Sequence, residues 1–298
     1  MDNLLVLILT YKCNLGCSYC PTIKANRIMK WGVAKRSLDL FSKLNSSDLE
    51  IKFFGGEPLL EFELIKKIVK YNKSFNKNFK YELTTNGILL DKRKIDFLKK
   101  NNFELRVSID GDKKTQLSGR GKNAGKVLEK LNEKDKEYVI VNIVISPKNV
   151  NKFYDNFKFL YSKGFRKFNL LPALFNDWSA RKITEFKRQL TKIIPFVKEK
   201  RIYIKNKDIL KTQYLFNEGI VVDYDGAIYN SNDILIKYFE KYKSKLNSKN
   251  VFLIKDINKL SFNKNKLNKV LNTDLNLKKM HKLNLKLDFV LTDFVNHI

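Results

Sequence analysis

The three cysteines of this 298-residue chain all lie within eight positions, at Cys13, Cys17 and Cys20. An odd number of thiols cannot all pair in disulfides, and the rest of the sequence is typical of a reducing compartment. A closed zinc site needs four ligands, whereas the two histidines, His281 and His297, lie far along the chain. Three thiolates suit a cubane iron–sulfur cluster instead, with one iron left without a protein ligand. The C-x3-C-x2-C spacing therefore favours an iron–sulfur centre whose open iron binds a small molecule, with zinc as the alternative.

The cysteines directly follow an apolar segment, Leu4–Thr10, which predicts a buried strand. This segment is too short to form the core of a signal peptide or to span a bilayer. We therefore expect a cytoplasmic protein without a membrane span. The content of 43% hydrophobic residues is typical of a globular protein, and the length suits one large α/β domain with or without an appendage.

Strand patterns alternate with helix patterns over the first 200 residues. The predicted strands are Leu4–Thr10, Ile51–Phe54, Tyr81–Thr84, Glu104–Ile109, Tyr138–Ile145 and Lys167–Leu171. The predicted helices are Gly32–Leu44, Glu61–Tyr71, Lys92–Lys100, Lys122–Leu131, Asn151–Ser162 and Ser179–Lys200. Six βα units predict a parallel sheet, either open or curled into a partial barrel. The chemistry of such folds lies at the carboxyl ends of the strands, which is where the cysteines follow the first strand.

The alternation ends near residue 205. The stretch GIVVDYDGAIYN predicts a β-hairpin that turns at Asp225-Gly226, and the Lys/Asn/Leu-rich tail beyond Lys237 predicts helices. The net charge of +28 favours an anionic partner such as nucleic acid, or else reflects the composition of an AT-rich genome. We favour the second interpretation, because lysine greatly exceeds arginine and the lysines are spread along the chain.

Three further motifs follow the next three predicted strands. They are FFGGEP (Phe53–Pro58), TTNG (Thr84–Gly87) and SIDG (Ser108–Gly111). Together with the cysteine spacing, they resemble the radical S-adenosylmethionine (SAM) superfamily. Their order resembles the branch of anaerobic sulfatase-maturating enzymes and peptide-modifying SPASM proteins. The resemblance implies a partial (β/α)6 TIM-like barrel over residues 1–205. It also implies a small degenerate SPASM or twitch-like region over 206–298.

The resemblance implies that the three thiolates hold one 4Fe-4S cluster, whose fourth iron binds the amino and carboxylate groups of SAM. The reduced cluster gives one electron to the sulfonium, which yields methionine and a 5′-deoxyadenosyl radical. This radical then removes a hydrogen atom from the substrate. The electron is expected from a donor such as flavodoxin or ferredoxin. No general acid or base can be assigned, and the catalytic residue on the substrate side is unknown.

The same resemblance implies several contacts with SAM near the segment that carries the three cysteines, residues 11–20, which we call the cysteine loop. Tyr19 is expected to pack near the adenine, and Gly55 and Gly56 to let the backbone approach the methionyl amino group. Glu57 is expected to accept a hydrogen bond from that ammonium or to buttress the loop. The simpler alternatives are an ordinary loop aromatic for the tyrosine and a strand-end turn for the glycines.

Further implied contacts come from later strands. Ser108 and Asp110 are expected to contact the ribose and nearby polar groups, although Asp-Gly is also a favourable turn. The resemblance aligns Arg120 with an arginine that binds the SAM carboxylate, to which a guanidinium is suited. An ordinary surface arginine is the alternative in so basic a chain. Leu171 is expected to flank the adenine or to belong to the core.

Two departures from the family pattern affect function. Relatives carry a His-Asp pair where this chain has Gln116-Leu117, so no acid–base role can be transferred there. Ser231 stands where the SPASM stretch has a cysteine, and no cysteine follows Cys20. We therefore expect no cysteine-ligated auxiliary cluster, and we expect the C-terminal region to cover the barrel or to hold the substrate.

The leading hypothesis for the substrate is a peptide or protein side chain, because the motif set resembles that of peptide-modifying enzymes. Since the first strand begins at Leu4, we expect no leader-binding domain before it. One alternative is a small anionic metabolite such as a nucleotide or a sugar. Another is a non-catalytic module on a degenerate radical SAM fold that binds RNA or an acidic partner through its basic surface.

Overall fold

The computed structural model of the chain describes residues 3–209, 219–262 and 265–298. Its strands are β1 (Leu4–Thr10), β2 (Asp48–Gly55), β3 (Asn78–Thr85), β4 (Phe103–Ser108), β5 (Ile140–Ile145), β6 (Lys167–Pro172), β7 (Tyr203–Ile204), β8 (Ile220–Val222), β9 (Ala227–Tyr229) and β10 (Lys249–Asn250). Its α-helices are α1 (Trp31–Phe41), α2 (Phe62–Asn72), α3 (Lys92–Lys100), α4 (Lys113–Arg120), α5 (Val127–Lys130), α6 (Glu133–Tyr138), α7 (Phe153–Ser162), α8 (Ala180–Glu199), α9 (Asn206–Ile209), α10 (Lys243–Leu246), α11 (Asn265–Thr273) and α12 (Leu275–Asn296).

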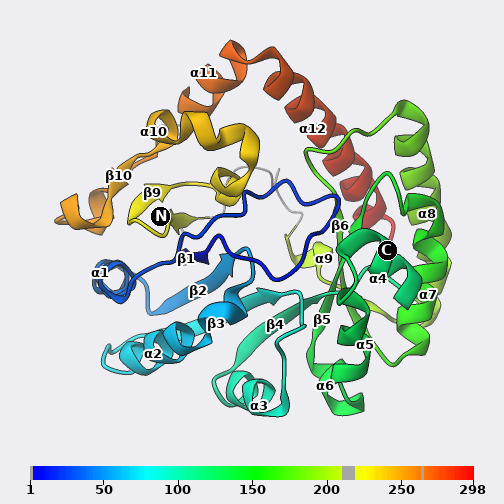
Figure 1. Ribbon diagram of the computed structural model, residues 1–298, viewed down its shortest axis with the longest axis horizontal. Coiled ribbons are helices and arrows are strands. Elements are labelled where there is room, and N and C mark those ends of the chain that lie inside the picture. Colours follow the sequence, from blue (N-terminus) through cyan, green and yellow to red (C-terminus); the bar gives the residue numbers. More distant parts are fainter. Residues whose placement is uncertain (1–2, 210–218, 263–264) are drawn as a thin grey trace.

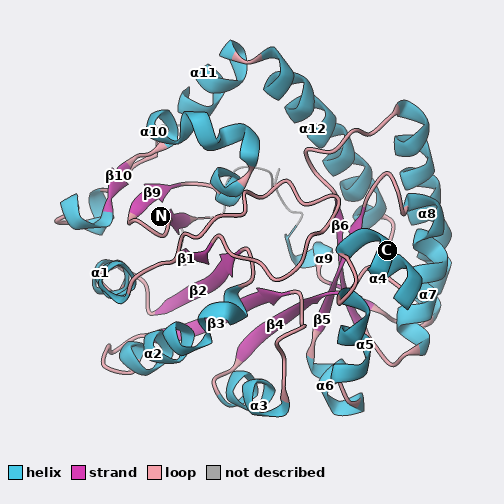
Figure 2. Ribbon diagram, in the orientation of Figure 1, coloured by secondary structure: helices cyan, strands magenta, loops and turns pink. Residues whose placement is uncertain are grey.

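The described strands form one sheet in the order β10-β9-β8-β1-β2-β3-β4-β5-β6-β7. Strands β1 to β6 are parallel neighbours in chain order. Figure 1 shows that this part of the sheet curves, with α1, α2, α3, α6 and α7 along its outer side. The strands line the inner side of the curve (Figure 2). The predicted α/β fold with a partial barrel is thereby confirmed.

Strand β1 is buried on both faces, which explains its uninterrupted apolar sequence. Leu5, Leu7 and Leu9 belong to the main core, which also contains side chains of α1 and α2. Val6 and Ile8 belong to a second cluster that contains Ala227, Tyr229, Ile234 and Leu235 from the C-terminal region. The first strand is therefore covered by a segment that lies more than 200 residues further along the chain.

The structure corrects one predicted helix, Lys122–Leu131. A 3-10 turn over Ala124–Lys126 and the short helix α5 occupy this part of the chain, and a separate helix that the prediction did not include, α4, precedes them. Helix α4 begins where the side chain of Asp112 accepts a hydrogen bond from the N–H of Thr115. It ends at Gly121, whose φ of 102° favours glycine and does not continue a helix. The prediction missed α4 because this helix is mostly polar.

The predicted hairpin is confirmed as β8 and β9, which are antiparallel. Gly226 adopts a φ of 89° in the turn, and its N–H donates to the carbonyl of Asp223 at 3.0 Å. Strand β8 is parallel to β1 and extends the barrel sheet. The division into a barrel over 1–205 and an appendage over 206–298 stays a prediction, and residues 210–218 and 263–264 of that appendage lie outside the described residues. Among the described helices, none is long and apolar enough to cross a membrane.

Candidate functional site

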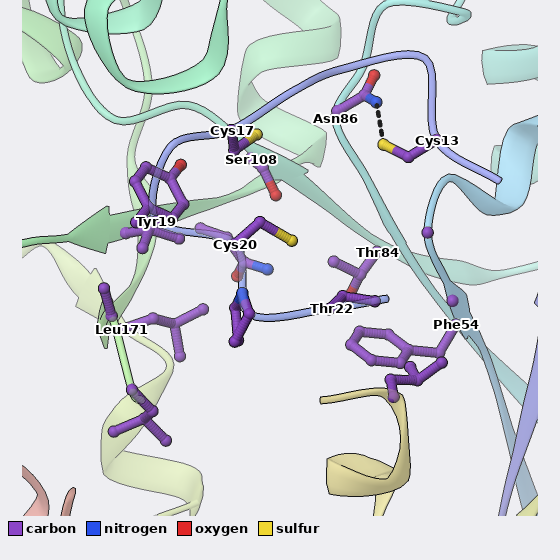
Figure 3. Close-up of a pocket in the computed structure, with 18 of the residues that line it drawn as sticks. Cys13, Cys17, Tyr19, Cys20, Thr22, Phe54, Thr84, Asn86, Ser108 and Leu171 are labelled. Carbon is purple, nitrogen blue, oxygen red and sulfur yellow. Dashed lines mark hydrogen bonds between the residues drawn. The ribbon is translucent and has the colours of Figure 1, made fainter. Parts of the chain in front are cut away.

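A cavity of about 380 Å³ lies at the carboxyl ends of the parallel strands. The cysteine loop forms one wall of it through Cys13, Cys17 and Cys20 (Figure 3). The other lining residues that the prediction named are Tyr19, Gly55, Gly56, Ser108, Arg120 and Leu171. The structure therefore brings together nine of the predicted site residues around a single space. Their contacts with SAM and iron stay predictions.

The cysteine loop is held by neighbours on both sides. The side-chain amide of Asn86, just beyond β3, donates to the sulfur of Cys13 at 3.9 Å (Figure 3). The N–H of Ser18 donates to the carbonyl of Gly119 in α4 at 2.8 Å. Burial raises the pKa of the Cys13 thiol, and it raises that of Cys17 to about 11, although Arg120 opposes the shift at Cys17. A metal that binds these thiols must therefore displace their protons.

Gly55 and Gly56 let the end of β2 approach the start of the cysteine loop. A Cβ atom on Gly55 would lie 2.3 Å from the carbonyl oxygen of Thr10, and one on Gly56 would lie 2.2 Å from that of Lys12. The N–H of Gly56 donates to the Thr10 carbonyl, and that of Glu57 donates to the Lys12 carbonyl, both at 2.8 Å. The two glycines thus position the loop, whether or not they also contact a cofactor.

Glu57 is buried beneath the loops rather than at the cavity surface. Its carboxylate accepts hydrogen bonds from the hydroxyl of Thr85 at 2.6 Å and the N–H of Asn86 at 2.8 Å. A third bond comes from the N–H of Leu59 at 3.0 Å. Burial raises the pKa of Glu57, while these three bonds oppose the shift. These contacts favour the buttressing role over a contact with the ammonium of SAM, and the assignment stays a prediction.

Asp110 connects three parts of the site. Its carboxylate accepts bonds from the hydroxyl of Tyr19 at 2.5 Å and from the N–H of Val144, at the end of β5, at 2.9 Å. It also forms a two-pronged ion pair with Arg120, at 2.9 Å to Nε and 2.8 Å to Nη2. With four hydrogen bonds within the chain and only 1% exposure, Asp110 positions its neighbours rather than presenting a free carboxylate to the ribose. Sequence reasoning missed this role.

Arg120 lies between Asp110 and the cavity. Its guanidinium carbon is 5.5 Å from the centre of the Tyr19 ring, and two of its five N–H donors are used by Asp110. Burial lowers its pKa, but the adjacent Asp110 and Tyr19 more than offset this and hold it above its ordinary value, so the group stays charged. The remaining donors are suited to a carboxylate in the cavity.

Gln116, which stands where the family pattern has the first residue of a His-Asp pair, makes structural contacts. Its Oε1 atom accepts a hydrogen bond from the N–H of Asp110 at 2.7 Å, and its Nε2 atom donates to the carbonyl of Ala124 at 3.3 Å. The side chain is fully buried, whereas Leu117 is 41% exposed. The Gln116-Leu117 departure therefore stabilises the loop that carries Asp110.

The C-terminal region reaches the cysteine loop and helps to enclose the cavity. Asp233, Leu235 and Ile236 line the cavity opposite the barrel strands. The N–H of Ile23 donates to the carbonyl of Leu235 at 2.8 Å. Ser231, which stands in the place of the SPASM cysteine, accepts a hydrogen bond at its Oγ atom from the N–H of Asp233 at 3.1 Å. The region thus forms part of the wall of the cavity.

Polar residues that the sequence analysis did not single out form the floor of the cavity. They are Lys52 on β2, Arg106 on β4, Asn142 on β5 and Asn169 on β6. The signal for them is a polar residue at every second position of otherwise apolar strands, which places those side chains on the inner face.

The arrangement of the cysteines fits a cluster better than a single metal ion. The available donors are three thiolates from one loop, and they border one cavity. A zinc ion requires its ligands to converge on one point. A cubane binds each thiolate through a different iron, so its ligands surround it. Three cysteines that border one cavity match the arrangement of ligands around a cubane.

Comparison with known proteins agrees with this geometry. Residues 7–160, more than half of the chain, match the radical SAM superfamily. A cysteine-type anaerobic sulfatase-maturating enzyme of Clostridium perfringens is 26% identical over 270 residues, which cover 76% of this chain and 73% of that enzyme. A probable GTP 3′,8-cyclase of Methanococcus maripaludis is 45% identical over 92 residues, 29% of each chain. Several curated relatives match over only 34% to 51% of their own length.

A solved structure of native anSMEcpe with bound AdoMet and the Kp18Cys peptide resembles the present fold. The TM-score is 0.70 at 21% sequence identity, and the match covers 84% of this chain and 78% of the other. At this level of identity the likeness concerns the fold. The match over residues 7–160 shows that the chain belongs to the radical SAM superfamily.

Proposed function

We propose that this chain cleaves SAM reductively and uses the resulting 5′-deoxyadenosyl radical to remove a hydrogen atom from a substrate. The observation that carries the proposal is that Cys13, Cys17, Cys20 and Arg120 line one cavity at the carboxyl ends of the strands. The three thiolates would hold a single 4Fe-4S cluster, which would supply one electron to the sulfonium of SAM. That electron comes to the protein from a donor such as flavodoxin or ferredoxin.

The chain's own residues bind and orient SAM in this proposal. Arg120, kept charged and oriented by Asp110, binds the carboxylate of SAM. Tyr19 and Leu171 enclose the adenine, and Ser108 donates to the ribose. A bound substrate that closes this space would exclude water, which protects the radical from side reactions.

The substrate that we propose is a peptide or protein side chain. A sulfatase-maturating relative and the peptide-bound solved structure support this class. The cyclase relative and the two cations on the cavity floor, Lys52 and Arg106, favour a small anionic metabolite such as a nucleotide as the alternative. The two substrate classes are distinguished by testing whether a peptide or a nucleotide loses a hydrogen atom when it is incubated with the reduced protein and SAM.

The test is formation of 5′-deoxyadenosine by anaerobically purified protein that has been reconstituted with iron and sulfide and reduced with dithionite. We expect slow formation even without substrate, because cleavage needs only the cluster and SAM. A variant with alanine at all three cysteines is expected to form none. If the reconstituted wild type also forms none but binds RNA tightly in a salt-dependent way, the chain is a binding module rather than an enzyme.

A further inference from the structure

Two asparagines form a pair on the floor of the cavity. Asn142 on β5 and Asn169 on β6 are register partners, and Ser108 on β4 is the register partner of Asn142. All three side chains therefore lie at one level of the barrel and line the cavity. The side-chain amide of Asn169 donates to the Oδ1 atom of Asn142 at 2.9 Å, and both residues are at most 4% exposed.

The pair leaves one buried acceptor without a partner. The Oδ1 atom of Asn169 has no hydrogen-bond partner among the described residues. Leaving a buried acceptor unsatisfied costs stability. Asn169 itself borders the cavity, so a small rotation of its side chain would present this atom to a donor of a ligand. The atom accepts and cannot donate, which selects an N–H or O–H group over a carboxylate or phosphate at neutral pH.

The charged residues on the floor of the cavity also favour a neutral donor over an anion. Arg106 lies 2.8 Å from Glu82 and 2.6 Å from Glu104, and Lys52 lies 3.6 Å from Glu82. Each cation is therefore already opposed by a carboxylate. An anionic group that entered the floor would have to compete with these ion pairs, whereas a neutral amide would not.

We propose that the Asn142–Asn169 pair binds an amide of the substrate, with the Oδ1 atom of Asn169 accepting a hydrogen bond from a peptide N–H. This inference rests on the proposed function, because it places a peptide group of the substrate in the cavity that the proposed function assigns to SAM. It narrows the substrate to the peptide class and names the residues that recognise it.

The test uses two probes of the same shape. N-acetylalanine N-methylamide carries two N–H donors, and methyl O-acetyllactate replaces both by ester oxygens. Their affinities for the reconstituted, SAM-loaded, unreduced full chain are measured by saturation-transfer NMR. We expect the diamide to bind at least fivefold more tightly than the diester to the wild type. In the Asn169→Leu variant the two probes should bind equally, with SAM affinity unchanged within twofold.

Asn72→Leu is the matched control. Asn72 is also buried, also has an Oδ1 atom without a partner among the described residues, and also donates through Nδ2, to the hydroxyl of Tyr81 at 3.2 Å. It is not among the cavity-lining residues, so this variant should keep the wild-type preference for the diamide.

Three results would overturn the inference. The first is equal or undetectable binding of both probes by the wild type, a comparison that needs no variant to fold. The second is a tenfold loss of SAM affinity in Asn169→Leu, which would assign the pair to the cofactor. The third is a preference for acetate or methyl ribofuranoside over the diamide. Formation of 5′-deoxyadenosine by the same preparation tests the proposed function separately.

Discussion

The carboxylate of Asp110 accepts two hydrogen bonds from the guanidinium of Arg120, with Nε–Oδ2 and Nη2–Oδ1 distances of 2.9 and 2.8 Å. Both side chains are at most 6% exposed. The arginine therefore cannot turn away from the cavity without leaving a buried carboxylate unpaired. The pair fixes the direction in which the remaining donors of Arg120 point, which is what recognition of the SAM carboxylate requires.

The first prediction concerns SAM affinity. Arg120→Ala is expected to weaken SAM binding by about 1.5–3 kcal/mol, because it removes a charge-assisted hydrogen bond to the carboxylate. Equilibrium binding to the reconstituted, unreduced protein measures the change. Arg188→Ala is the control, since Arg188 forms a similar two-pronged pair with Glu185 on the exposed face of α8. Unchanged affinity in Arg120→Ala would refute the assignment of this arginine without refuting cluster binding.

The second prediction concerns the stability that Asp110 provides. Asp110→Asn leaves the buried guanidinium of Arg120 without its counter-charge, which is expected to lower the free energy of unfolding by about 3–5 kcal/mol. Urea denaturation of the metal-free chain measures this loss. Glu185→Gln is expected to change it by less than about 1 kcal/mol, because the side chain of its partner Arg188 is 53% exposed. Equal losses of unfolding free energy in the two variants would mean that the buried ion pair contributes no more to stability than the pair on α8.

The third prediction concerns the contact between β2 and the cysteine loop. In Gly56→Ala the new Cβ would lie 2.2 Å from the Lys12 carbonyl oxygen, so the loop must shift. We expect a loss of about 1–3 kcal/mol in unfolding free energy, as in other overpacked sites, together with poorer iron incorporation. Gly32→Ala in α1 is the control, because nothing lies within 4 Å of its added Cβ. Full iron content and stability in Gly56→Ala would contradict the close approach.

The fourth prediction concerns pH. Burial raises the pKa of Glu50 above 4.5, and repulsion by Glu82 and Glu104 adds to the shift. Its ionisation therefore costs folding stability, and the cost appears as the pH rises above about 4.5. Glu50→Gln should unfold at higher urea concentration than the wild type at pH 7, and this advantage should vanish near pH 4. Glu63→Gln, whose side chain is 84% exposed, should show no such difference. A constant advantage at every pH would exclude this explanation.

The sequence predicted the features that depend on local pattern. Continuous apolar runs such as Leu4–Thr10 identified the buried strands, and the spacing of Cys13, Cys17 and Cys20 identified the chemistry. Alternative roles of Glu57 could be stated but not separated, because a carboxylate can bind a ligand or a neighbouring loop equally well. Only the three hydrogen bonds in the structure support the second role.

The missed features depend on contacts between distant segments. Asp110 and Arg120 were both predicted as ligands of SAM, whereas their pairing depends on how α4 folds back over the loop after β4. The hydroxyl of Tyr11 donates to the carboxylate of Asp223, 212 residues away, at 2.9 Å, and this contact joins the cysteine loop to the hairpin. No local pattern specifies which strand edge such a hairpin will occupy.

The most direct test of the account is the iron content of the reconstituted chain, combined with electron paramagnetic resonance of the reduced protein. With no cysteine after Cys20, we expect about four irons per chain, as one cubane requires, and a single reduced 4Fe-4S signal. The variant with alanine at Cys13, Cys17 and Cys20 should lose essentially all of the iron and the signal. A 4Fe-4S signal that survives in this variant, or stoichiometric zinc in a colourless wild type, would contradict the account.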